Sequence, residues 1–226
     1  MSQQLIDRVM KFLEKRMDAS DLPVPEVVID GSVAYYDTSE RKILMPELSE
    51  NDPENVFLLC TYVAMFVHQE VNPRLFSTFE AEKKSGEEDQ DLRDPRIRSI
   101  RFKEQLVQHI VPTYAALECL AHILNEKISR QAETYLLLTN ALELRNVPAG
   151  IQKYRCEAGV LEGVRLRNLA RVTGRNFLPV LSRIQTQENY IGFCGETAPS
   201  LLTKDGPLVH LVLSSEMPAT TTGYNS

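Results

Sequence analysis

Three residues have the types and spacing that a metal site needs. His68 ends a long apolar run, while Glu118 and His122 lie four residues apart in ECLAH and would face the same side of a helix. Imidazole nitrogens and carboxylate oxygens are ligands that zinc accepts. The three form the candidate metal site, to which Glu70 or His109 could add a ligand. The alternative is an ordinary Glu–His pair on a partly exposed helix face.

The residues just before His68 decide what such a metal could do. Hydrolysis by an HExxH helix needs two histidines one turn apart and a glutamate that activates the bound water. The five residues ending at His68 are Ala64-Met65-Phe66-Val67-His68. One imidazole and one carboxylate bind zinc weakly, and no base remains to deprotonate water. This segment favours a protein without catalytic activity.

The order of elements over roughly residues 1–125 resembles that of the minimal HExxH zinc metallopeptidases of phages and mobile elements. It consists of a helix, the strand PVPEVVID, the hairpin AYYDTSERKILMP, an apolar helix with His68 and a helix with Glu118. By this resemblance His68 matches the second histidine and Glu118 the distal glutamate ligand. Ala64 and Met65 stand where the first histidine and the catalytic glutamate belong. The resemblance therefore implies a zincin-like core with a degenerate motif, which is a pseudoenzyme.

A second group of candidate residues is a row of arginines late in the chain. Three of them would share one helix face if the helix continued past Gly174, and a row of guanidinium groups suits phosphate, nucleic acid or an acidic partner. No aromatic residues interleave with the row, so stacking on single-stranded bases has no support. The alternative is a solvated helix face, or pairing with an acidic loop over residues 80–94. The candidates for binding a polyanion or a partner are Arg165, Arg167, Arg171 and Arg175.

Composition limits the class of protein. The chain has 226 residues, 43% of them hydrophobic and 25% charged, which is typical of a globular protein. Its net charge of −6 argues against binding nucleic acid through the whole surface. The longest apolar run, Val56–Val67, is shorter than the roughly 20 residues that cross a bilayer. The four cysteines lack CxxC spacing and the N-terminus lacks a signal peptide, so we expect a cytoplasmic protein without membrane contacts.

Hydrophobic periodicity and turn signals predict the elements of the first half. Residues 3–17 form an amphipathic helix. Residues rich in β-branched and aromatic types then predict a small antiparallel meander. A central helix begins at Asn51 or Asp52, with Asp52 as its N-cap and Pro53 at its first position, and ends at Asn72-Pro73. The three predicted strands are Glu26–Asp30, Ser32–Tyr36 and Lys42–Met45.

The sequence of the second half predicts mostly helices. We interpret Gly159 and Gly163, which have GxxxG-like spacing, as a place where two helices pack closely. A short strand is expected at Leu208–Leu213. The predicted helices are Ile97–Lys127 with a kink or break at Pro112, Arg130–Arg145, 151–172, and a last piece at Asn176–Ile184.

These elements predict a mostly helical α+β protein with a zincin-like core. Residues 1–185 form a single domain, made of a helix, meander and core helix (1–75), a charged loop (76–96) and a helical bundle (97–185). Residues 186–226 form an extended C-terminal appendage.

The expected function is that of a non-catalytic interaction or assembly protein that needs no cofactor and works with a protein partner. One alternative is a zinc-dependent hydrolase that uses His68, Glu118 and His122. The other is a phosphate- or nucleic-acid-binding module that uses the arginine-rich helix.

Overall fold

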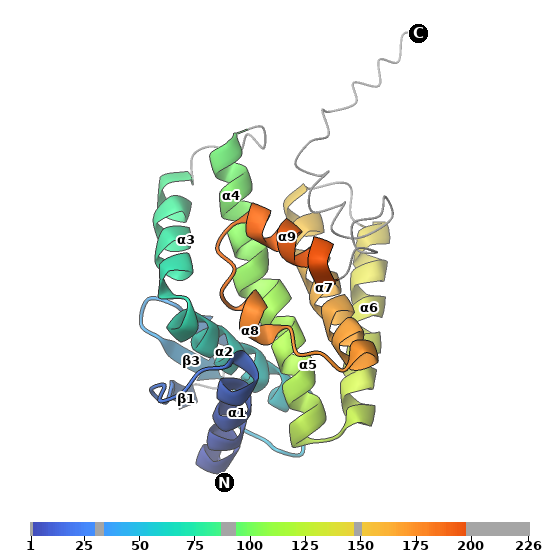
Figure 1. Ribbon diagram of the computed structural model, residues 1–226. Coiled ribbons are helices and arrows are strands. Elements are labelled where there is room, and N and C mark those ends of the chain that lie inside the picture. Colours follow the sequence, from blue (N-terminus) through green and yellow to red (C-terminus); the bar gives the residue numbers. More distant parts are fainter. Residues whose placement is uncertain (1, 30–33, 87–93, 147–150, 198–226) are drawn as a thin grey trace.

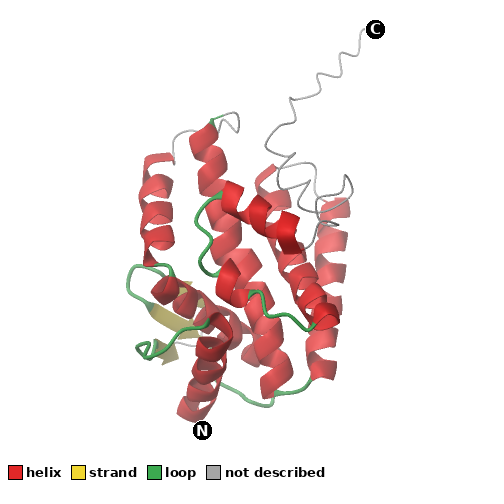
Figure 2. Cartoon of the chain, in the orientation of Figure 1, coloured by secondary structure: helices red, strands yellow, loops and turns green. Residues whose placement is uncertain are grey.

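The computed structural model describes residues 2–29, 34–86, 94–146 and 151–197, with the side chains of 84–86, 138–146 and 151–158 left aside. The described chain is mostly helical, with a small mixed sheet at one end (Figures 1 and 2). Helix α1 (Ser2–Met17) covers the core with a stripe of fully buried side chains at helical spacing. None of the helices in these ranges is long and apolar enough to cross a membrane.

The sheet differs from the predicted meander. Strands β2 (Tyr35–Asp37) and β3 (Lys42–Met45) form the expected antiparallel hairpin. Strand β1 (Glu26–Ile29), however, pairs with β3 in parallel, so the order is β1-β3-β2 and the meander prediction is wrong. β-Branched and aromatic residues identify a strand but carry no information about its direction or its neighbour. The predicted turn at Asp30-Gly31 lies outside the described residues.

Helix α2 (Pro53–Val71) begins and ends where its sequence predicts. The Asp52 carboxylate caps it by accepting a hydrogen bond of 3.0 Å from the backbone N–H of Glu54. After Asn72 a further helix, α3 (Pro73–Gly86), follows directly. The predicted charged loop over 76–96 is therefore wrong for residues 76–86. Leu75, Phe76 and Phe79 of α3 are almost completely buried, so this helix is held by tertiary packing despite its charged C-terminal half.

The long helix predicted across Pro112 is continuous but changes its winding. It runs through α4 (Pro95–Glu104), a π-helical segment η1 (Gln105–Ile110) and α5 (Val111–Ile123). Proline lacks a backbone N–H and its ring clashes with the carbonyl four residues earlier. A wider π-helical segment just before Pro112 accommodates both effects, and the chain continues through it without the break that was the alternative expectation.

The two glycines pack as predicted, on helix α7 (Ile151–Thr173) where it crosses η1. A Cβ atom at Gly163 would lie 2.8 Å from the backbone oxygen of Ile110, and one at Gly159 would lie 2.8 Å from the Cβ of His109. The N–H of Gly159 also donates to Gln105 Oε1 at 3.0 Å. Only residues without a side chain allow the two helices to approach this closely.

Helices α2 and α5 lie in contact at the centre of the molecule. Helix α6 (Glu126–Asn146) and α7 pack against α5, and α1 packs against both central helices (Figure 1). The last elements are α8 (Leu178–Leu181) and α9 (Gln187–Thr197).

The end of the described chain also departs from the expectation. Residues 187–197 are helical and bury Tyr190, Phe193 and Cys194, so the prediction of an extended appendage from residue 186 does not hold there. The predicted helix at Asn176–Ile184 is shorter than expected. Residues 198–226, with the predicted strand, lie outside the described chain.

Candidate functional site

His68 lies near the C-terminal end of α2 and is completely enclosed. Its side chain has 0% exposure, and neither Nδ1 nor Nε2 has a hydrogen-bond partner within the described ranges. The edge of the ring meets Phe76 of α3, with the ring centroids 5.1 Å apart. Burial lowers the pKa of His68 to about 3, and the nearby backbone of Ser182 acts in the opposite direction. The imidazole is therefore neutral and sits in the core.

The segment after α8 closes this end of α2. The Asn72 side chain donates to the backbone oxygens of Ser182 and Ile184, at 3.1 Å in each case. Gln185 Nε2 in turn donates to Asn72 Oδ1 at 3.3 Å. A chain segment more than a hundred residues away in sequence is thereby fixed next to His68.

The β2–β3 hairpin is attached to the same end of α2. Tyr36 donates its hydroxyl hydrogen to Gln69 Oε1 at 2.6 Å, and Gln69 Nε2 donates to the backbone oxygen of Thr38 at 3.0 Å. Arg41 forms an ion pair of 3.1 Å with Glu70, the residue that could have added a metal ligand. Burial raises the pKa of Tyr36, which keeps its hydroxyl protonated as a donor. These contacts hold the hairpin in place.

Glu118 and His122 face the same side of α5, as their spacing predicts, but that side faces α1. Glu118 is ion-paired with Arg16. His122 is stacked on Phe12, with the ring centroids 4.5 Å apart and the planes inclined by 17°. Each of these two candidate ligands therefore contacts its own residue of α1, and those two residues, Phe12 and Arg16, lie one turn apart.

The structure does not bring the candidate metal ligands together. Among the residues that it describes, no group of three or more His, Cys, Asp and Glu side chains could hold a metal ion. His68 belongs to the core contact with α3, whereas Glu118 and His122 belong to the contact with α1. His109, the other possible ligand, lies on η1 against Gly159, and burial lowers its pKa.

Two arginines of the predicted row form ion pairs with carboxylates of α6. Arg167 Nη2 pairs with Glu126 Oε2 of α6 at 2.8 Å, and Arg171 Nη1 pairs with Glu126 Oε1 at 3.3 Å. Glu133, two turns further along α6 than Glu126, lies within 4.0 Å of both guanidinium groups. The Arg167 side chain is only 5% exposed, so this is a buried contact that joins α6 to α7.

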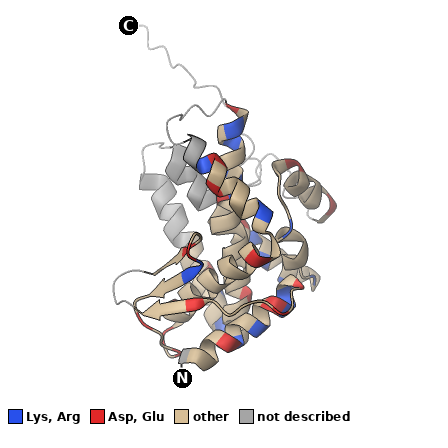
Figure 3. Ribbon diagram, turned by 90° about the vertical axis from the view of Figure 1, so that its left-hand side faces the viewer, with Lys and Arg blue, Asp and Glu red and all other residues tan. Residues whose placement is uncertain are grey.

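The rest of the row does not continue along the helix. α7 ends at Thr173, and Gly174 takes a left-handed conformation with φ of 66°. Arg175 therefore lies beyond the helix, and it is exposed, as is Arg165. Basic and acidic positions are also interspersed on the face formed by the sheet, α1 and α3 (Figure 3). The four arginines do not form one continuous cationic surface.

A buried carboxyl group on α7 could not have been found from the sequence. Glu162 is 0% exposed and accepts a hydrogen bond of 2.8 Å from the hydroxyl of Tyr190 on α9. Its second oxygen, Oε2, has no hydrogen-bond partner in the described part of the chain, and burial raises its pKa. Burial also raises the pKa of the nearby Cys194 thiol to about 12. The cluster anchors α9, and it depends on a contact between helices that local patterns do not specify.

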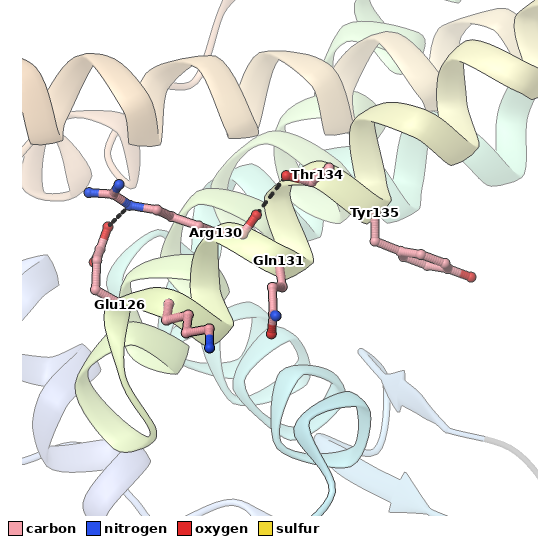
Figure 4. A pocket seen from close by; sticks show the side chains of 6 residues that line it. Glu126, Arg130, Gln131, Thr134 and Tyr135 are labelled. Atoms are coloured by element: carbon pink, nitrogen blue, oxygen red, sulfur yellow. Dashed lines mark hydrogen bonds and ion pairs between the residues drawn. The ribbon is translucent and has the colours of Figure 1, made fainter.

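An apolar groove, also missed from the sequence, opens between the N-terminal half of α2 and α6. Its volume is about 430 Å³. Its floor is formed by apolar side chains of three helices, and Glu54, Gln131 and Tyr135 lie at its edges. Tyr135 is 69% exposed, and its ring extends away from the neighbouring side chains of α6 (Figure 4). The apolar residues that line it are Pro53, Phe57, Leu58, Leu120, Ile128, Ala132 and Leu136.

A comparison of the chain with protein-family models finds no match, and comparisons with curated proteins and with solved structures find none either. What the protein does is therefore inferred from the residues and geometry of this chain.

Proposed function

We propose that the protein is a non-catalytic interaction protein of a cytoplasmic assembly, built on a degenerate zincin-like scaffold. The observation that carries this proposal is the groove between α2 and α6. It exposes a floor of apolar side chains next to the large exposed ring of Tyr135. Apolar surface of this kind, with polar residues at its edges, is characteristic of places where proteins contact one another.

The burial of the α2 segment that ends at His68 supports the same proposal. Ala64 and Met65 occupy the positions of the missing ligand and base, and both are buried, as is His68. A hydrolase needs an open coordination position that substrate and water can reach. Here the described residues enclose that segment of α2. This favours a structural use of the helix over the zinc-dependent hydrolase.

The polyanion-binding module receives less support. Arg167 and Arg171 form ion pairs with Glu126 and Glu133, and this pairing reduces their attraction for an external phosphate.

The first experiment measures metal in protein purified without added metal. We expect zinc and iron far below one ion per chain, with no difference between the parent and His68→Leu. Stoichiometric metal that is lost in His68→Leu would overturn the non-catalytic proposal.

The second experiment tests the surface. A photo-crosslinking residue at position 135 should form crosslinks to protein in the producing cells, and Leu58→Glu in the groove floor should abolish them. The same residue at position 35 is the matched control, because Tyr35 is 44% exposed but lies on β2. Equal crosslinking from positions 135 and 35 would remove the groove as the interaction site.

A further inference from the structure

We propose that the groove between α2 and α6 is the contact between two copies of this chain in a two-fold symmetric dimer. This inference rests on the proposed function and names the partner of that surface. In a two-fold dimer the same patch of each copy must fit itself, so that each feature finds its complement on the same face. Two independent features of the groove meet this condition.

The first feature is a projecting side chain beside a cavity. Tyr135, which is 69% exposed, stands at the edge of a groove of about 430 Å³. A tyrosine ring fits into that volume, and Leu58, Ile128 and the other apolar side chains would surround it. Because ring and groove lie on one face, a two-fold axis would place each Tyr135 in the groove of the other copy. Tyrosine is among the residues that most often dominate such contacts.

The second feature is a pair of opposite charges, one lining the groove and one beside it. Glu54 lines the groove from α2, while Lys127 lies just outside it, on α6 one turn before Gln131, where it lines an adjoining pocket that shares Gln131 and Tyr135 with the groove. Neither has an ion-pair partner among the residues that the structure describes, whereas the neighbouring Arg130 is paired with Glu126. A two-fold arrangement that sets the α2 wall of one copy against the α6 wall of the other brings Glu54 to Lys127 twice.

The dimer should be weak. One groove and one aromatic side chain from each copy make a small interface, of the class that dissociates at micromolar concentration. Sedimentation equilibrium of the full chain from about 100 to about 1 µM covers this range. We expect a reversible monomer–dimer equilibrium there, with no larger species.

Three variants test the two features separately. Tyr135→Ala should weaken the dimer about 30-fold or more, as loss of a central aromatic contact does. Lys127→Glu should weaken it about 10-fold at low salt, because it sets like charges against each other. The exchange Lys127→Glu with Glu54→Lys should restore the parental Kd to within about 3-fold, because it rebuilds the pairs with reversed sign. Tyr35→Ala and Lys15→Glu are the matched controls and should leave the Kd unchanged.

The charge exchange makes the proposal refutable even if one variant is poorly folded. Circular dichroism identifies such a variant, and all the substituted side chains are exposed. A chain that stays monomeric at about 100 µM overturns the dimer, as does a double variant no better than Lys127→Glu alone. If such a monomer still crosslinks from position 135 to another protein, the groove belongs to that partner and the proposed function stands. Stoichiometric zinc would refute the proposed function whatever the oligomeric state.

Discussion

Replacing His68 by leucine should stabilise the protein, and the gain should grow as the pH falls. The wild-type core holds an imidazole with 0% exposure, and neither nitrogen forms a hydrogen bond of normal geometry, although the backbone of Ser182 lies close enough to act on the ring. A buried polar group without a hydrogen bond costs about 1–3 kcal/mol, and a substitution of similar volume costs up to about 1.5 kcal/mol through imperfect packing. At neutral pH we therefore expect the leucine variant to gain about 1 kcal/mol.

The pH dependence follows from the pKa of His68. It is about 3 in the folded protein, against about 6.5 in the unfolded chain. Between these values the unfolded chain binds a proton that the folded protein cannot, so the wild type loses stability as the pH falls below 6.5. At pH 5 that loss amounts to about 2 kcal/mol, since each pH unit contributes about 1.4 kcal/mol. The leucine variant has no such loss.

The assay is urea unfolding of both proteins at several pH values from about 7.5 to 5, followed by circular dichroism. The difference between the two free energies of unfolding is the informative quantity, because the other titrating groups, His109 among them, are present in both. His122→Leu removes an exposed histidine and controls for the loss of any imidazole. Parallel pH profiles for wild type and His68→Leu would refute the picture of an enclosed neutral ring. A less stable variant that also loses bound zinc would identify His68 as a ligand.

Three further predictions concern the helix contacts, each measured by urea unfolding. Gly163→Ala should destabilise the protein by about 2 kcal/mol, because its Cβ would lie 2.8 Å from a backbone oxygen, whereas Gly192→Ala, with open space around it, should be neutral or slightly stabilising; equal effects would contradict the close contact of α7 with η1. Glu162→Gln should stabilise the protein at neutral pH and the gain should vanish in acid, because a raised pKa means that the folded state prefers the protonated carboxyl and loses stability as the pH rises through that pKa; a gain that does not change with pH would show that this carboxyl does not titrate differently on folding. Arg167→Met should cost about 3 kcal/mol because it removes the buried guanidinium beside the similarly buried Glu133 carboxylate, which then keeps only the ion pair of 3.9 Å with Arg171, while the exposed Arg165→Met should stay within about 0.5 kcal/mol; a small loss at both positions would refute the buried contact between α6 and α7.

Local chemistry was enough to predict the central helix. The carboxylate of Asp52, the ring of Pro53 and the break at Asn72 act within a few residues of themselves, so the limits of α2 could be deduced from the sequence. The packing of Gly159 and Gly163 was predictable for the same reason, since the absence of a side chain is a property of the residue itself.

The direction of β1 and the helical state of residues 187–197 could not be predicted, because they depend on contacts far apart in the chain. β1 finds its neighbour across the hairpin, and α9 is held by Tyr190 through a hydrogen bond to Glu162. The sequence around α9 has two glycines and a weak apolar pattern, so local propensity gave no signal that it would be ordered.

The surroundings of the candidate ligands could not be predicted for a related reason. Spacing correctly placed Glu118 and His122 on one side of a helix, but it could not tell that this side faces Phe12 and Arg16. The arginine row was likewise predicted to be available to a polyanion or a partner, because the acidic residues of α6 that pair with Arg167 and Arg171 are more than thirty residues away. The spacing of charged side chains on a helix indicates which of them could bind a ligand together. The packing of the helices decides which of them remain without a partner inside the protein.

The two ends of α2 lead to opposite expectations. At its C-terminal end His68 is enclosed by α3 and by the segment after α8. At its N-terminal end Phe57 and Leu58 are partly exposed and line the groove. A substitution at His68 should therefore change stability without changing association, while Leu58→Glu should change association with little loss of stability, because its side chain already borders solvent.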